Sequence, residues 1–280
     1  MQPTREFKFP ELTVTAAVIT DPGCVRDNNE DNGLHVKPSS WEDQPARGTL
    51  TIVADGMGGH SSGEVASSMA VELISRYFYE DGSSTTEEAL RSAIERASTE
   101  IYDSSVSDIK YFGMGTTVVA LAIQANYGYV AHVGDSRMYR LRGEVMERMT
   151  NDHSQVMEMV KLGIITPEEA DTHEDKNVIL RAVGTQPSVE VETYGPFQVE
   201  PGDEFMLCSD GLCDMANDNE IYSLWFGSTN IHDACEKLVE FAKARGGNDN
   251  ITVGVVRTAA AESHDQAVRR APITRQVEAG

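Results

Sequence analysis

The sequence has few cysteines and no long apolar run. Its four cysteines, Cys24, Cys208, Cys213 and Cys235, form no CxxC pair, so neither a zinc site nor a disulfide framework is indicated, and we expect all four to be structural or incidental. No stretch approaches the roughly 18 consecutive apolar residues that a membrane-spanning helix requires, and the first residues carry no signal-peptide core. We therefore expect a cytoplasmic protein that does not bind a membrane.

Basic residues are also scarce. The 23 Lys and Arg face 45 Asp and Glu, which gives a formal net charge of −22. A protein that binds duplex nucleic acid needs a basic footprint to neutralise phosphates, so this charge argues against that class. Any phosphate chemistry would need local positive charge from a metal ion or a placed arginine.

Three enzyme motifs are missing as well. The chain contains no GK[ST] of a phosphate-binding loop, no GxSxG of a serine hydrolase and no HExxH of a zinc protease. What it does contain is ordinary globular composition, with 40% hydrophobic and 24% charged residues over 280 positions. A chain of this kind should bury a substantial core.

Apolar or alternating stretches bounded by turn residues predict many strands. Several of them follow one another through short turns that leave no room for a crossover helix, so antiparallel sheet is favoured. The predicted strands cover 12–20, 49–55, 116–124, 128–134, 137–143, 203–209 and 251–256.

Three amphipathic helices are predicted over 61–78, 86–102 and 231–245. The first two begin with capping boxes, and the third stops at a pair of glycines. The boxes pair Ser61 with Glu64 and Thr85 with Glu88.

Two segments differ from this pattern. Residues 152–180 are predicted to form short helices, which indicates an excursion inserted into the sheet pattern. The end of the chain lacks periodicity. We expect a single domain over residues 1–258 and a disordered tail over 259–280.

Three of the predicted strands end in an aspartate that a small residue follows: Asp55, Asp135 and Asp210. Aspartate is a common turn residue, so one such ending could be incidental. Three can converge if the strands lie side by side. Asp249 stands in a polar turn before the last strand, and an all-oxygen site of this kind suits Mg²⁺ or Mn²⁺ better than zinc.

Eight ordered motifs identify a resemblance. They are GCVRDNNED, VADGMGGHSSGEVAS, GMGTT, HVGDSRMY, NDHS, LGIITPEEADTHEDKNVILRAVG, SDGL and GGNDNIT, spread over about residues 14–256. This set resembles the bacterial branch of the metal-dependent serine/threonine protein phosphatases, the PPM or type 2C family. The resemblance implies an α+β fold, a four-layer sandwich of two antiparallel β-sheets flanked by α-helices.

The resemblance also implies an activity. A hydroxide that bridges two central Mn²⁺ or Mg²⁺ ions would hydrolyse phosphoserine and phosphothreonine on proteins. The enzyme would counteract a cognate bacterial Ser/Thr kinase, and nothing requires more than a monomer. Residues 152–180 match the family's flap, which could set substrate preference or act as a passive cover.

The family's metal ligands map onto this chain residue by residue. Asp55 matches the aspartate that bridges the central ions, and Gly56 the residue whose carbonyl binds one of them. Asp210 and Asp249 match the carboxylates of the other ion. Asp135 matches a ligand of a third, weaker ion that also uses Asp210.

Further residues are implied around the metals. Asp31, with Glu30 as a second candidate, would hold the site through metal-bound water. Arg26 matches the arginine that grips the substrate phosphate, which its planar fork suits. The alternative for Arg26 is a simple ion pair with Glu30 or Asp31.

One position departs from the family. Other branches carry a histidine two residues after the bridging aspartate as general acid, and here that residue is Met57. The nearest histidine, His60, could serve instead, and a metal-bound water is another proton donor. We expect His153 to be a structural hydrogen-bonding residue.

Two other functions are compatible with the same fold. One is a catalytically silent, phosphatase-like binding module, which the presence of Asp55, Asp210 and Asp249 disfavours. The other is a small-molecule phosphatase that uses the same metals. The tail also contains a basic-directed kinase motif before Thr274, which solvated arginines alone would explain.

Overall fold

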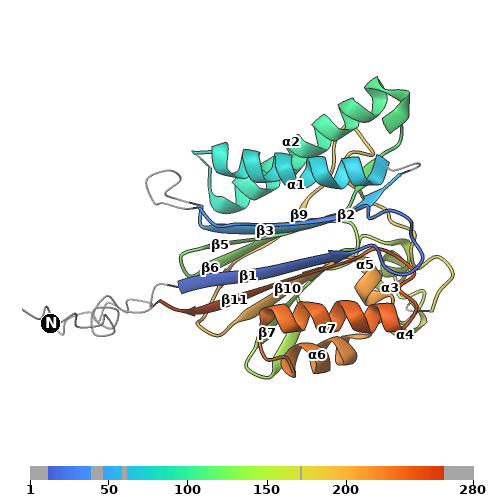
Figure 1. Cartoon of the computed structure of the whole chain (residues 1–280). Helices are drawn as coiled ribbons and strands as arrows, with labels where there is room; N and C mark the ends of the chain where they lie inside the picture. Colours follow the sequence, from blue (N-terminus) through green and yellow to red (C-terminus); the bar gives the residue numbers. More distant parts are fainter. Residues whose placement is uncertain (1–11, 39–46, 59–61, 83, 171, 262–280) are drawn as a thin grey trace, which may run out of the picture.

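Two antiparallel sheets pack face to face, and helices cover both outer faces (Figure 1). The computed structural model describes residues 12–38, 47–58, 62–82, 84–170 and 172–261. The first sheet has the strand order β1-β11-β10-β7-β8, and the second has the order β2-β3-β5-β6-β9 with β4 paired to β3. This is the four-layer α+β sandwich that the sequence predicted.

Every named strand pair is antiparallel. The strands of the first sheet are β1 (Leu12–Asp21), β11 (Ile251–Ala260), β10 (Glu204–Cys208), β7 (Arg137–Arg142) and β8 (Val145–Arg148). Those of the second are β2 (Asp31–Val36), β3 (Thr49–Met57), β4 (Gly115–Thr116), β5 (Val118–Gln124), β6 (Tyr127–Val133) and β9 (Glu192–Gln198).

Helices α1 and α2 cover the second sheet, and α6 and α7 lie against the first (Figure 1). Short helices occupy the predicted flap and the turn after β10. Among the described residues no helix is both long and apolar enough to cross a membrane. The helices are α1 (Ser62–Glu80), α2 (Thr86–Ser107), the 3-10 turn Ile109–Tyr111, α3 (Gln155–Lys161), α4 (Pro167–Ala170), α5 (Asp210–Cys213), α6 (Asp218–Phe226) and α7 (Ile231–Ala244).

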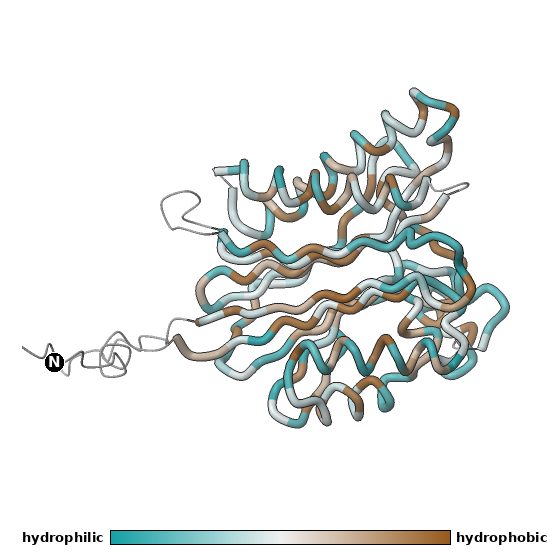
Figure 2. Tube along the Cα trace, in the orientation of Figure 1, coloured by the Kyte–Doolittle hydropathy of each residue, from teal (hydrophilic) through white to brown (hydrophobic). Residues whose placement is uncertain are grey.

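The core consists of three apolar layers because both faces of each sheet are covered. Along β3, Ile52 and Ala54 face α1 and α2, whereas Val53 between them faces the other sheet. The third layer lies between the first sheet and α7. Apolar colouring accordingly runs along both sheets and along the inner sides of the helices (Figure 2).

The helix predictions agree with the structure where it describes them. Thr85 and Glu88 form the predicted capping box of α2, and the apolar face of that helix is buried, with Leu90, Ala93, Ile94, Ala97 and Ile101. Thr166 and Glu169 form the same arrangement in the flap. The predicted cap residue Ser61 lies outside the described residues.

The strand and boundary predictions need corrections. The sequence pattern missed β2, β8 and β9, whose residues are only partly buried and therefore alternate weakly. The predicted tail also begins too early, because Ala259 and Ala260 still belong to β11 and pair with Thr13 and Leu12. The rest of the predicted tail, 262–280, lies outside the described residues, as does Thr274.

Candidate metal centre

Carboxylates from both sheets meet at one end of the sandwich. β2 and β3 pair so that Asp31 lies opposite Asp55. In the other sheet, Asp210 opens α5 directly after β10, and Asp249 comes just before the neighbouring β11. Ser209 joins the two sheets here, because its hydroxyl donates to Asp31 Oδ2 at 2.7 Å.

We refer to Asp31, Asp55, Asp135, Asp210 and Asp249 as the carboxylate cluster. Burial raises the pKa of Asp55 well above its ordinary value, and the charges of Asp31 and Asp210 raise it further. Burial also raises the pKa of Asp31 to about 7 and that of Asp210 to about 6, and the charge of Asp249 acts in the same direction on both. Burial also raises the pKa of Asp135 well above its ordinary value, and the charge of Asp210 acts in the same direction. The five carboxyl groups are therefore close enough to repel one another.

Three oxygens of this cluster indicate the kind of ligand that it would bind. Asp31 Oδ1, Asp135 Oδ1 and Asp210 Oδ1 are buried and have no hydrogen-bond partner among the described residues. A buried anionic oxygen without a partner is costly, and a cation would satisfy it. Because every donor here is an oxygen, the cluster fits Mg²⁺ or Mn²⁺.

Gly56, next to the predicted bridging aspartate, occupies a position that only glycine fits. Its N–H donates to the carbonyl of Glu30 at 3.1 Å. A Cβ at this position would lie 2.1 Å from the carbonyl oxygen of Gly63 and 2.4 Å from that of Glu30. The absence of a side chain thus lets the loop before β2 and the start of α1 close around the cluster.

Two hydroxyl residues that the sequence analysis overlooked position the strand-end aspartates. Thr117 Oγ1 accepts a hydrogen bond from the N–H of Asp55 at 3.1 Å and lies 2.7 Å from Ser136 Oγ. Ser136, which follows Asp135, is therefore a buried connecting residue as well as a turn residue. The signal in the sequence was the GMGTT motif, whose two threonines open the predicted strand 116–124.

Asn250 is a second overlooked residue. Its side chain accepts from the N–H of Glu30 at 2.7 Å and donates to the carbonyls of Pro22 at 3.0 Å and Asn28 at 2.9 Å. One buried amide thus fixes the whole loop between β1 and β2 beside Asp249. An asparagine next to a predicted metal ligand was the available signal.

Arg26 stands at the exposed side of the cluster. Its Nη2 donates to Asp249 Oδ2 at 2.7 Å, and 56% of its side chain is exposed. The ion pair therefore forms with Asp249, and not with Glu30 or Asp31, which the alternative interpretation of Arg26 named as partners. The hydrogen bond raises the pKa of Arg26 further, so the group stays charged. The predicted general acid His60 lies outside the described residues.

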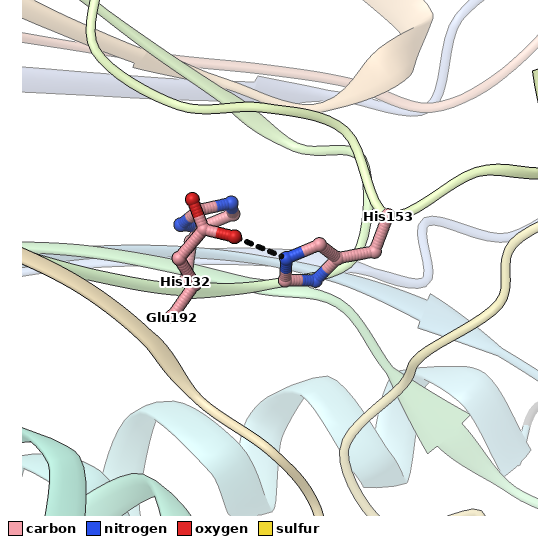
Figure 3. Close-up of side chains that lie close together, drawn as sticks. All are labelled: His132, His153 and Glu192. Atoms are coloured by element: carbon pink, nitrogen blue, oxygen red, sulfur yellow. Dashed lines mark hydrogen bonds and ion pairs between the residues drawn. The ribbon is translucent and has the colours of Figure 1, made fainter. Parts of the chain in front are cut away.

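A separate group of possible metal ligands lies between the sheets, where His132, His153 and Glu192 come together (Figure 3). The N–H of Gly134 donates to His153 Nδ1 at 3.1 Å, so the ring proton sits on Nε2 and points to Glu192 Oε2 at 3.2 Å. His132 Nε2 likewise donates to the carbonyl of Asn151 at 2.9 Å.

Both rings are thus engaged as hydrogen-bond donors, and they stack with centroids 4.6 Å apart. Burial lowers the pKa of His132 and of His153, which keeps both rings neutral. His153 also donates its own N–H to the carbonyl of Gly134 at 2.9 Å. It therefore acts as the structural hydrogen-bonding residue that the sequence predicted, and it holds the turn that carries Asp135.

Comparison with known proteins agrees with this geometry. A family profile described as Protein phosphatase 2C matches residues 28–245. The serine/threonine phosphatase stp of Listeria monocytogenes is 40% identical over 242 residues, which cover 85% of this chain and 93% of the relative. The protein phosphatase PhpP of Streptococcus pneumoniae is 38% identical over 243 residues, covering 86% and 96%.

The chain belongs to the protein phosphatase 2C family. Among solved structures, the serine/threonine phosphatase Stp1 from Staphylococcus aureus superposes with a TM-score of 0.79 at 31% identity, covering 94% of this chain and all of that one. The catalytic domain of the phosphatase PstP, solved with two manganese ions, has a TM-score of 0.74 at 31% identity and covers 89% of this chain and 99% of that one. The predicted fold, family and enzyme class, a serine/threonine protein phosphatase, agree with these relatives.

The flap of this phosphatase forms one wall of a pocket of about 600 Å³. Asp135 and Asp210 line the pocket at the carboxylate cluster, and Met157 and Lys176 line it from the flap. Lys176 Nζ donates to Asp214 Oδ1 at 3.0 Å, which ties the flap to the end of α5. The predicted excursion therefore borders the candidate metal centre.

Proposed function

We propose that this protein hydrolyses phosphoserine and phosphothreonine on other proteins with the help of Mn²⁺ or Mg²⁺. The observation that carries the proposal is the carboxylate cluster, in which aspartates of two sheets converge and three buried carboxylate oxygens lack a protein partner. Such a cluster is costly unless a divalent cation neutralises it. When bound, the two ions supply a nucleophilic hydroxide at neutral pH and offset the charge of the phosphate.

Each residue has a proposed task in holding these ions. Asp55, Asp210, Asp249 and the backbone carbonyl of Gly56 would hold the two central ions. Asp31 would support the site from the neighbouring strand. Asp135, at the pocket wall, is the proposed ligand of a third ion that shares Asp210, which the position of both residues on the same pocket supports.

Arg26 is the proposed phosphate-binding residue. Its ion pair with Asp249 holds the guanidinium beside the metal ligands, and its exposure leaves the remaining N–H groups open to a phosphate. A metal-bound aspartate would pair less strongly with Arg26, which would free the fork for substrate. His60 remains the proposed donor of the proton to the departing serine or threonine oxygen.

The remaining proposals concern the setting of the enzyme. We propose that it acts as a monomer in the cytoplasm and opposes a cognate Ser/Thr kinase. The binding-module alternative is not favoured, because every aspartate of the cluster is in place. A small-molecule phosphatase differs only in its substrate, and the 600 Å³ pocket beside the flap supports a substrate larger than a free phosphate.

The test is release of phosphate from a phosphothreonine peptide by the purified full chain. We expect activity with Mn²⁺, none with EDTA, and a loss of more than about 100-fold in Asp210→Asn, since disturbing groups around a metal ligand already costs 10- to 100-fold. Asp103→Asn on the exposed face of α2 is the matched control and should keep full activity.

Two outcomes would overturn the proposal. One is a folded, Mn²⁺-loaded wild type that turns over no member of a phosphopeptide panel. The other is Asp210→Asn with the activity of the control, because the cluster would then not be the catalytic site.

A further inference from the structure

Two of the four thiols lie together beside the metal centre. Cys208 is the last residue of β10 and Cys213 the last of α5, and their sulfur atoms are 3.5 Å apart. Cys208 is fully buried, whereas Cys213 is partly exposed and lines the pocket. The other two thiols have no cysteine partner in the described part of the chain: Cys24 is exposed, and Cys235, in α7, is buried against β1.

The residues between the two thiols are part of the candidate site. Ser209 holds Asp31 by its hydroxyl, and Asp210 is a proposed ligand of the central ions. Any bond between the two sulfurs would therefore close a short ring around the segment that presents this ligand. Simple packing would also explain two adjacent thiols, but packing does not require that one of them open to a pocket.

Of the two neighbouring thiols, Cys213 is the one that a small reagent reaches first, because it lines the pocket and Cys208 is buried. The hydrogen bond from the Cys208 thiol lowers the pKa of Cys213, and the guanidinium groups of Arg137 and Arg148 act in the same direction. A cysteine that opens to a pocket and lies 3.5 Å from a second thiol has the features of an oxidation-sensitive site.

We infer that Cys208 and Cys213 form a redox pair that a peroxide oxidises to a disulfide, which reversibly inactivates the metal centre. In the first step the Cys213 sulfur attacks one peroxide oxygen, an S–O bond forms, the O–O bond breaks and water leaves. In the second step the Cys208 sulfur attacks the Cys213 sulfur, the S–O bond breaks and a second water leaves. Two electrons pass from the thiols to the peroxide, and both thiol hydrogens end in water.

The disulfide changes the position of Asp210. An S–S bond is about 2.05 Å long, so the sulfurs must approach by about 1.5 Å from their present separation of 3.5 Å. α5 has only four residues, and its first is Asp210 and its last Cys213, so a shift of its end also moves the ligand. We expect Mn²⁺ binding to weaken by about 10- to 100-fold, the usual effect of disturbing the surroundings of a metal ligand.

The test treats the reduced full chain with hydrogen peroxide in EDTA, removes the peroxide with catalase and then measures three quantities. These are the alkylation of each cysteine by mass spectrometry, the affinity for Mn²⁺ by calorimetry and the phosphatase rate. We expect the peptide that contains Cys208 and Cys213 to lose two hydrogens and to resist alkylation. The affinity and the rate should fall together and return with dithiothreitol.

Two variants separate the pair from other thiols. Cys213→Ser should keep its own untreated rate and Mn²⁺ affinity after peroxide, and Cys24→Ser, which lacks the exposed thiol, should be inactivated like the wild type. The inference is wrong if both pair cysteines of the wild type can still be alkylated after inactivation. It is also wrong if Cys213→Ser is inactivated as fast as the wild type.

The inactivation part of this inference rests on the proposed function, but the chemistry can be tested without it. A reduced enzyme without phosphatase activity would refute the proposed function, while the alkylation pattern and the Mn²⁺ affinity would still decide the redox pair. Where Cys213→Ser fails to fold, the mapping of the wild-type peptide decides alone, because an absent disulfide refutes the pair.

Discussion

At the scale of single residues, the carboxylate cluster is a site whose ionised form is disfavoured without a cation. Burial raises the pKa of Asp31 to about 7 and that of Asp210 to about 6 in the metal-free protein. An unfolded chain titrates near the ordinary aspartate value of about 4. The folded protein therefore binds more protons than the unfolded chain between about pH 4 and pH 7.

The sign of the pH dependence follows from this difference. By linkage, the free energy of unfolding falls as the pH rises through that window, so we expect the metal-free protein to be more stable at about pH 5 than at about pH 7.5. Urea unfolding in EDTA at the two pH values measures this difference in the free energy of unfolding. Asp31→Asn should reduce the difference, whereas the surface variant Asp103→Asn should retain it. Metal-free stability that increases from the lower to the higher pH contradicts the prediction.

At the scale of elements, the loop between β1 and β2 is fastened to β3, α1 and β11 at a few points of close contact. Gly56 allows two carbonyl oxygens to approach within 2.4 Å of where a Cβ would lie. Asn250 fastens the same loop from the other sheet through three hydrogen bonds to its backbone. Together they place Asp31 and Arg26 beside the remaining aspartates.

We expect Gly56→Ala to destabilise the protein by about 1–3 kcal/mol, the usual cost of forcing extra volume into a packed site. The added methyl would press against the backbone of Glu30 and Gly63, which cannot move independently. Denaturant unfolding measures the loss. Gly82→Ala is the matched control, since nothing lies within 4 Å of its Cβ position. Equal free energies of unfolding of the two variants would contradict the prediction, because the backbone around Gly56 would then accommodate a methyl group without loss of stability.

Asn250→Ala should lower both stability and activity. It removes three hydrogen bonds worth about 1 kcal/mol each and leaves the N–H of Glu30 without its partner, so we expect a loss of about 2–4 kcal/mol. The turnover of a phosphopeptide should drop as well, because the loop carries Arg26. The exposed neighbour Asn248→Ala serves as control. A variant with full stability and activity would mean that the loop holds its position without this amide.

At the scale of the whole molecule, the candidate metal centre joins the two sheets. Asp31 and Asp55 belong to the second sheet, and Asp210 and Asp249 to the first, so a bound cation would link both halves of the sandwich. The flap is also attached to the first sheet's side of the site, because Lys176 forms an ion pair with Asp214 at the end of α5. Metal binding and global stability should therefore be coupled.

We expect Mn²⁺ at about 100 times its dissociation constant to add roughly 2.7 kcal/mol to the free energy of unfolding for each site. Thermal unfolding over a series of Mn²⁺ concentrations checks this. The melting temperature of Asp210→Asn should rise little with Mn²⁺, and that of Asp103→Asn should rise as much as in the wild type. A melting temperature that is independent of Mn²⁺ in the wild type would contradict a cation that bridges the sheets.

The sequence by itself determined the features that depend on neighbouring residues. Strands that end in Asp55, Asp135 and Asp210, the capping box of Thr85 and the family motifs are local patterns, so they could be read without a fold. Weakly alternating strands such as β2 could not, because partly exposed edge residues carry little periodicity.

Only the tertiary structure decided the contacts between distant segments. Pairing of β1 with β11 puts Asp21 opposite Ile251, and this brings Arg26 to Asp249, 223 residues away, where the sequence suggested a local partner. The same pairing places Asn250 over the loop after β1. Such contacts follow from strand order and register, which one-dimensional patterns do not encode.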